Sequence, residues 1–168
     1  MQQQQFNDVS NILWRERQLL DLLIFKLEEE QLVMAAGRTR WLANATREVE
    51  TVLGEIKRLE LDRAVSVADL AHTLALGDAP SLGDIAEKAP NPWNTIFADH
   101  RRALLELAQE IDSVAQSNRE LLTRGQQATR EALQAMGDVG DVEVGAYTPS
   151  GTPAADRGLS LRLIDEAI

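Results

Sequence analysis

The chain contains no cysteine among its 168 residues, and this absence removes several kinds of chemistry at once. Without thiols there are no disulfide bonds, no thiolate metal sites and no cysteine nucleophile. Histidine is almost as scarce, because His72 and His100 are the only two and neither has a matching second ligand nearby in the sequence. The chain also lacks a P-loop, a GxGxxG turn and an HExxH helix. Glu48 and Glu60 lack the Glu-x-x-His pairs of a di-metal bundle. We therefore expect a protein that is not an enzyme and holds no metal or cofactor.

Long apolar runs, aromatic residues and positive charge are also in short supply. No run is long enough to span a bilayer, and the first residues, MQQQQFND, lack the basic and apolar regions of a signal peptide. The net charge of −10 argues against binding to nucleic acid or to an anionic membrane surface. Aromatic content of 4 % favours a thin aliphatic seam over a thick core. The simplest expectation is a cytoplasmic protein.

What the chain has in abundance is heptad-spaced aliphatic residues, most regularly over residues 93–136. This stretch follows Asn91-Pro92 and precedes Gly137, and Asn91 is a candidate cap with Pro92 at the first helical position. A sustained repeat of 3.5 residues predicts a helix of about 65 Å that buries one narrow seam. The column spaced by seven contains Phe97, Leu104, Ile111, Asn118, Gly125 and Ala132.

Two members of that column are not apolar. Asn118 puts an amide in the seam, where a lone polar residue typically fixes register or partner number. Gly125 costs roughly 1 kcal/mol relative to alanine inside a helix, which makes sense where another chain approaches closely or the helix bends. Ordinary sequence drift in a tolerant coiled coil explains both residues equally well.

The first half of the chain predicts two more long helices. Residues 1–6 are rich in glutamine and are expected to be disordered. The first helix is then capped by Asn7 or Asp8 and ends near Gly37, and the second runs from residue 39 to about residue 63. Gly37 is either a turn, which would make a hairpin, or a kink in one very long helix. The first helix repeats its apolar residues every seven positions, at Leu13, Leu20, Leu27 and Met34.

Residues 64–92 predict a connector of two short helices, because Ser66 with Asp69 and Ser81 with Asp84 each form a capping-box pattern. After Met136 the sequence is rich in glycine and has no helical period, so residues 137–168 are expected to form a flexible tail. Its last residues, LSLRLIDEAI, are apolar enough to dock, either on the bundle or on a partner. The spacing of the apolar residues in this short segment is compatible with a helix and also with a strand.

Together these features predict an all-α protein. The expected architecture is an elongated antiparallel helical bundle, or coiled coil, of three long helices with a short-helix connector and a flexible C-terminal tail. The expected division is a disordered start (1–6), a helical bundle (7–136) and the tail (137–168).

Three stretches of the chain form a recognisable combination. The first is LLDLLIFKLEEEQLVMAAGRTRWLANATREVETVLGEIKRLELDR, with a leucine-rich helix, an acidic patch, Gly37, and Glu48, Ile56 and Leu59 beyond it. The second is SNRELLTRG, an asparagine–leucine–glycine stretch in the last long helix, and the third is AYTPSG, a short tyrosine-to-glycine motif. Together they resemble the FlgN family of cytoplasmic flagellar export chaperones. The connector and the residues after Gly151 match nothing in this pattern.

The resemblance implies a chaperone that binds the C-terminal helices of the hook–filament junction proteins FlgK and FlgL and delivers them to the flagellar export gate. An amphipathic cargo helix needs a complementary groove with anchors at i, i+3, i+4 and i+7. We therefore predict that the seam of the last long helix carries cargo. The candidate residues are Leu107, Ile111, Val114, Asn118, Leu121, Leu122 and Gly125.

The same resemblance implies that Tyr147 and Gly151 dock on the export gate. Tyr147 is the only tyrosine and lies in a segment whose neighbours predict no core, so an anchoring role suits it. The alternative for Tyr147 is packing against its own bundle. The alternative for the whole protein is a self-associating coiled-coil scaffold, in which Asn118 would set the register of a homodimer.

Overall fold

The computed structural model describes residues 2–136, and every regular element within them is a helix. The elements are α1 (Gln2–Ala35), α2 (Thr39–Thr73), α3 (Leu82–Lys88) and α4 (Trp93–Ala135). The prediction of an all-α chain is confirmed for this part of the protein. The predicted tail at 137–168 lies outside the described residues.

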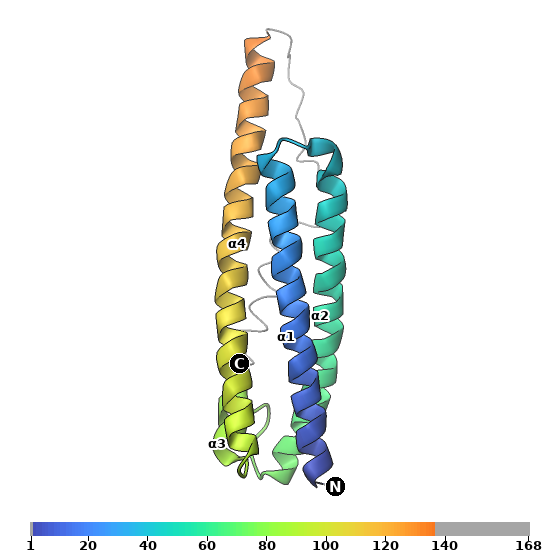
Figure 1. The fold of residues 1–168 in the computed structure, drawn as a ribbon, viewed down its shortest axis with the longest axis vertical. Coiled ribbons are helices and arrows are strands. Elements are labelled where there is room, and N and C mark those ends of the chain that lie inside the picture. Colours follow the sequence, from blue (N-terminus) through green and yellow to red (C-terminus); the bar gives the residue numbers. More distant parts are fainter. Residues whose placement is uncertain (1, 137–168) are drawn as a thin grey trace.

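Helices α1 and α2 form a hairpin joined by a tight turn (Figure 1). Gly37 makes this turn with φ +63°, a left-handed conformation that glycine adopts without steric cost, so the question of turn or kink resolves to a turn. Cross-helix pairs show the opposite directions of the two helices, because Lys26 contacts Glu48 near the turn and Glu16 contacts Arg63 further away.

Helix α4 runs beside α1 in the same direction (Figure 1). At its start, the Trp93 ring stacks on Phe6 with centroids 5.4 Å apart. Further along, Asn118 reaches the Leu27 carbonyl. Helices α2 and α4 each pack along α1 but have little direct contact with each other. Helix α1 is therefore the central element of the fold, and its contacts hold the other two long helices in place.

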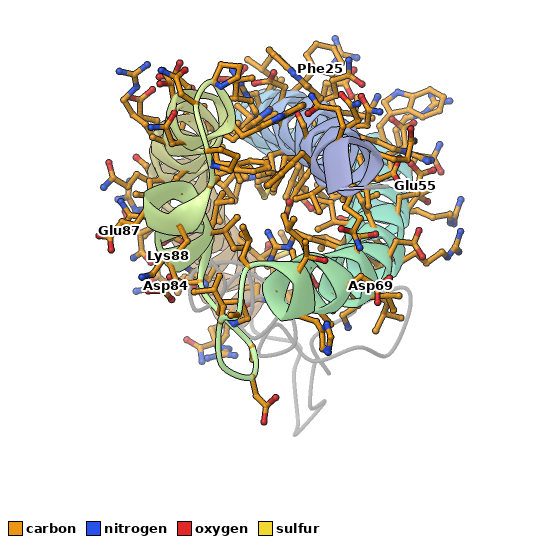
Figure 2. All side chains as sticks on the ribbon, turned by 90° about the horizontal axis from the view of Figure 1, so that it is seen from below. Phe25, Glu55, Asp69, Asp84, Glu87 and Lys88 are labelled. Atoms are coloured by element: carbon orange, nitrogen blue, oxygen red, sulfur yellow. The ribbon has the colours of Figure 1, made fainter. Side chains whose placement is uncertain are left out.

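The core follows the predicted repeat of apolar residues. In α1, Leu13, Leu20 and Leu27 are buried, and so is the α4 column as far as Asn118. Figure 2, seen along the bundle, shows Phe25, Glu55 and Asp69 on its outer side. The other buried apolar residues fill the space between the helices: Phe6, Val9, Leu19, Leu23, Ile24, Ala45, Val49, Val52, Ile56, Leu59, Leu70, Ala71, Leu82, Ile85, Ala89 and Trp93.

Two predicted boundaries at the ends of the hairpin were wrong. Helix α1 begins at Gln2 rather than at Asn7 or Asp8, so residues 2–6 are helical and not disordered. The reason is Phe6, which is only 2 % exposed and draws the first turn onto α4. Helix α2 continues to Thr73 instead of ending near residue 63, because apolar residues such as Leu70 still face the core.

In the connector, one of the two capping boxes is real. The Ser81 hydroxyl accepts a hydrogen bond from the Asp84 amide, and the Asp84 carboxylate accepts one from the Ser81 amide, at the start of α3. Ser66 lies inside α2 and caps nothing. Asn91 does not cap α4 either, because Pro92 occupies the N-cap position with no side-chain cap and the helix begins at Trp93.

Candidate functional site

The predicted cargo residues occupy three different environments along α4. Ile111 is completely buried and belongs to the core between α4 and α1. Leu107 and Val114 are half-buried and pack against that core from its edge. Leu121 is also half-buried, whereas Leu122 is 42 % exposed and Gly125 is exposed. The predicted cargo residues therefore include buried or half-buried side chains up to Asn118 and mostly exposed ones after it.

Asn118 marks that transition through a buried network of hydrogen bonds. Its Nδ2 donates to the Leu27 carbonyl at 2.8 Å and to the Glu30 carboxylate at 3.1 Å. The Thr46 hydroxyl donates to the other Glu30 oxygen at 2.7 Å, so the network joins α4, α1 and α2. The Leu27 carbonyl and the Glu30 carboxylate lie within reach of the Asn118 amide at only one position of α4 along α1. These hydrogen bonds therefore fix the register of α4 against α1 within the same chain.

Beyond Asn118 the last turns of α4 have little packing against the rest of the described chain. Figure 1 shows this end of the helix projecting past the α1–α2 turn. Leu122 is 42 % exposed, and a Cβ added at Gly125 would meet no atom within 4 Å. Leu32, near the end of α1, is 69 % exposed. The helix from Asn118 to Ala135 is about 25 Å long, and most of its residues after Asn118 are exposed.

A buried ion pair supports the middle of the hairpin, and the sequence analysis missed it. Arg63 Nη1 donates to both oxygens of Glu16, at 2.8 and 2.9 Å, and the two side chains are 8 % and 1 % exposed. Burial raises the pKa of the Glu16 carboxyl, and the charge and hydrogen bond of Arg63 oppose that rise. The available signal was the position of Glu16, three residues after Leu13 and four before Leu20 on an apolar face.

His100 lies in the core between α1 and α4. Its ring is 1 % exposed, its Nε2 is 3.3 Å from the Ser10 hydroxyl, and the Trp14 ring meets it edge-on at 5.1 Å. Burial, together with the nearby Arg17 charge, lowers the pKa of His100 to about 4. The imidazole is therefore neutral at pH 7 and acts as a packing residue.

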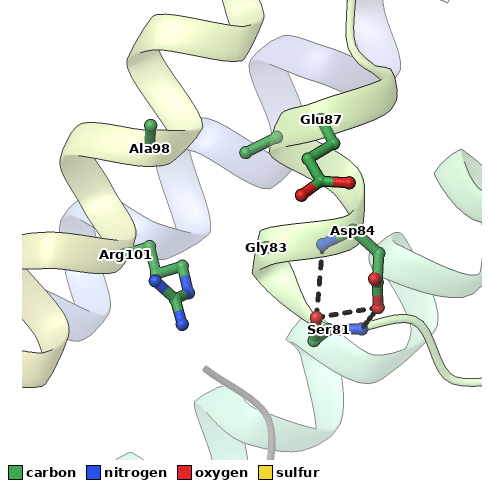
Figure 3. A pocket seen from close by; sticks show the side chains of 7 residues that line it. Ser81, Gly83, Asp84, Glu87, Ala98 and Arg101 are labelled. Carbon is green, nitrogen blue, oxygen red and sulfur yellow. Dashed lines mark hydrogen bonds between the residues drawn. The ribbon is translucent and has the colours of Figure 1, made fainter.

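A hollow open to solvent lies between α3 and α4. It has a volume of about 350 Å³, and Ser81, Asp84, Glu87 and Arg101 are among the residues that line it (Figure 3). Asp84 already serves the capping box, and the hollow is open to solvent. Within residues 2–136 no group of three or more histidine, aspartate or glutamate side chains is arranged to hold a metal ion.

Comparison of the sequence with models of known protein families identifies the family of this helical protein. The family model described as FlgN protein matches residues 1–155. The chain belongs to the FlgN family. No curated protein and no solved structure gives a significant match.

Membership of the FlgN family indicates a chaperone of flagellar export. The match includes the connector, which resembled nothing in the sequence pattern, and it also spans Tyr147 and Gly151. Both of these residues lie outside the described residues. None of the helices described for this FlgN-family chain is long and apolar enough to cross a membrane.

Proposed function

We propose that this protein is a cytoplasmic chaperone that binds the C-terminal helices of the junction proteins FlgK and FlgL and delivers them to the flagellar export gate. Its task is binding, without catalysis, and it needs no cofactor. The three long helices serve as one elongated bundle in which α1 is antiparallel to α2 and parallel to α4, so the predicted antiparallel arrangement holds for the α1–α2 hairpin alone. The FlgN match supports the chaperone role, and the structure of α4 supports the location of the cargo site.

The observation that carries the location is the exposed end of α4. A cargo helix with an apolar stripe needs a partner helix whose own apolar residues are accessible. Leu122 is exposed and Leu121 is half-buried, and both meet this requirement because they follow Asn118, the last buried residue of α4. Gly125, one turn further, has open space around it and would let a second helix approach closely.

The remaining predicted residues take a supporting role in this proposal. Ile111 and Asn118 are buried, so they hold α4 against α1 and set the direction in which its free end projects. Leu107 and Val114 lie at the edge of the core, where a bound helix can extend its contact from the free end. The proposed cargo site therefore begins at Leu107 and is centred on Leu121 and Leu122.

Calorimetric titration with C-terminal helical peptides of FlgK and FlgL tests this location. Leu122→Glu should weaken binding more than tenfold, because it places a charge in the apolar contact, while the melting temperature stays close to that of the wild type. The matched control is Leu61→Glu on α2, where the leucine is 71 % exposed and far from the proposed site. Equal affinity of both variants and the wild type for cargo would contradict the location.

For the export gate we propose docking through Tyr147 and Gly151, separate from the cargo site. An aromatic side chain offers a large contact area with few rotatable bonds, which suits an anchor. Tyr147→Ala should weaken binding to the purified cytoplasmic part of the gate and reduce export, while cargo affinity and melting temperature stay unchanged. A marked fall in melting temperature would show instead that Tyr147 packs on the bundle.

A self-associating scaffold that uses Asn118 to set its register has less support. The Asn118 amide group already donates to Leu27 and Glu30 of the same chain, so it is not available as the register-setting donor of a homodimer.

A further inference from the structure

The free end of α4, residues 119–135, contains a short sequence repeat that burial does not account for. The residues RELL at 119–122 return as REAL at 130–133, eleven positions later, and Asn118 before them is the last buried residue of the helix. Eleven residues make about three turns of an α-helix, so equivalent residues of the two copies lie on the same side of α4, about 16 Å apart. We call this the RExL repeat, and its two copies present the same side chains in the same direction.

Within each copy of the RExL repeat the arginine lies beside the leucine. Arg119 precedes Leu122 by three positions, as Arg130 precedes Leu133, and residues at this spacing are neighbours on a helix surface. Leu122 is 42 % exposed, Leu133 is half-buried, and both arginines are exposed. The repeat thus forms two apolar positions, each with a positive charge on the same flank.

The positive charges of this flank are not neutralised by carboxylates within residues 2–136. Arg119 donates a hydrogen bond to the neutral side-chain oxygen of Gln116 at 3.2 Å, and Arg130 is in no ion pair with this part of the chain. The two glutamates of the repeat lie about 100° further round the helix. Each of them accepts a hydrogen bond from the glutamine four residues before or after it in its own turn, at 3.0 and 2.9 Å. The flank is therefore basic in a protein whose net charge is −10.

We propose that the free end of α4 selects cargo helices that carry a carboxylate beside each of two apolar residues about three turns apart. The selection rests on the cargo site proposed above and adds the chemistry of its ligand. The apolar residues of such a helix contact Leu122 and Leu133, and its carboxylates pair with Arg119 and Arg130. The two arginines are then specificity-determining residues, because a helix with lysine or arginine at those positions meets like charge.

A cargo helix fits this pattern better than other segments of the same chain do. A helix must extend over more than eleven residues to reach both copies of the repeat, because equivalent residues are eleven positions apart. Among residues 137–168 the longest stretch without glycine or proline is 159–168, which has ten residues. A second copy of the chain brings a second net charge of −10, and like net charges oppose association.

Calorimetric titration of the full chain with the C-terminal helical peptides of FlgK and FlgL tests the role of the two arginines. Arg119→Gln/Arg130→Gln should bind about three- to tenfold more weakly than the wild type, since each exposed ion pair contributes only modestly. Its melting temperature should match that of the wild type, because both side chains are exposed. The matched control Arg15→Gln/Arg58→Gln makes the same change in net charge at exposed arginines of α1 and α2, and it should bind like the wild type.

Salt and peptide variants test the contribution of charge to this binding. An increase in NaCl from about 50 to about 500 mM should weaken binding by the wild type several-fold and binding by the double variant much less, because salt screens exposed charges. Peptides whose aspartates and glutamates beside the apolar stripe are changed to asparagine and glutamine should lose affinity for the wild type but not for the double variant.

Three results would overturn the inference. Equal affinity of the wild type and Arg119→Gln/Arg130→Gln for cargo, with Leu122→Glu still weakened, would exclude the role of the arginines and leave the proposed cargo site intact. Tighter binding by the double variant would show that the arginines hold an acidic segment of this chain or of a second copy instead of cargo. Absence of binding by the wild type to either peptide would refute the proposed function and the inference together.

Discussion

Replacement of Arg63 by methionine should destabilise the bundle far more than an ordinary polar substitution. The change removes the only hydrogen-bonding partner that Glu16 has among residues 2–136, and the Glu16 side chain is 1 % exposed. An unpaired buried charge of this kind typically costs about 3–5 kcal/mol. Total stabilities of single domains are about 5–15 kcal/mol, so Arg63→Met should remove a large share of the folding free energy.

The double variant Glu16→Leu/Arg63→Met removes both charges. Comparison with Arg63→Met separates the free energy lost by leaving Glu16 unpaired from the free energy that the ion pair itself contributes to folding. Well-packed apolar residues often replace a buried ion pair without loss, so we expect the double variant to lie within about 1 kcal/mol of the wild type. Urea unfolding at pH 7, followed by circular dichroism, gives the three free energies and their coupling. A loss below about 1 kcal/mol for Arg63→Met alone would refute the reasoning, because it would mean that water solvates Glu16.

The pH dependence of Arg63→Met provides an independent check. Burial raises the pKa of Glu16 in the folded state, and removal of Arg63 takes away the charge that opposes this rise. A carboxyl whose folded-state pKa exceeds its unfolded value favours folding in its protonated form, so the stability that it costs at pH 7 returns as the pH falls. The deficit of Arg63→Met relative to the wild type should therefore shrink between pH 7 and pH 5.

Three further results are expected. His100 binds its proton less readily in the folded state, with a pKa of about 4 against the ordinary 6.5, so the wild type should lose about 3 kcal/mol from this group as the pH falls from 6.5 to 4. His100→Gln should lack this component in urea titrations across that range, and parallel pH profiles would contradict it. Gly37→Ala should lower stability by about 1 kcal/mol through its positive φ alone, since a Cβ there meets no atom within 4 Å, and an unchanged melting temperature would contradict this. Ile111→Ala should cost about 2–5 kcal/mol in urea unfolding, and a cost like that of a surface residue would show that Ile111 is not core.

The long helices and their buried residues were predictable because the seven-residue repeat of apolar side chains in the sequence is also the repeat with which packed helices bury them. The α4 column at Phe97, Leu104, Ile111 and Asn118 is buried as its spacing predicts. The same column continues through Gly125, but there the sequence could not show that the burial ends. Where α4 loses its partner depends on the length of the α1–α2 hairpin beside it, and that is a tertiary property.

Contacts between distant residues account for the other differences. Phe6 made the first turn helical by stacking on Trp93, 87 positions later, and no local signal announces such a contact. Ser66 had the same local pattern as Ser81, yet it lies inside α2 because the apolar face continues past it. The cargo residues could be proposed from the seam, but their division into buried and exposed members required the packing against α1.

The central place of α1 has a consequence for the order of folding. Its contacts with α2 join residues close in sequence, such as Lys26 and Glu48, 22 positions apart, whereas the Asn118–Leu27 contact with α4 spans 91 positions. Closing the longer loop costs about 1 kcal/mol more in chain entropy, so we expect the hairpin to form first and α4 to dock onto it. We expect the same order during synthesis, because the hairpin precedes α4 in the sequence. In the mature protein, hydrogen exchange should then show α4 opening at a lower free energy than the hairpin that supports it.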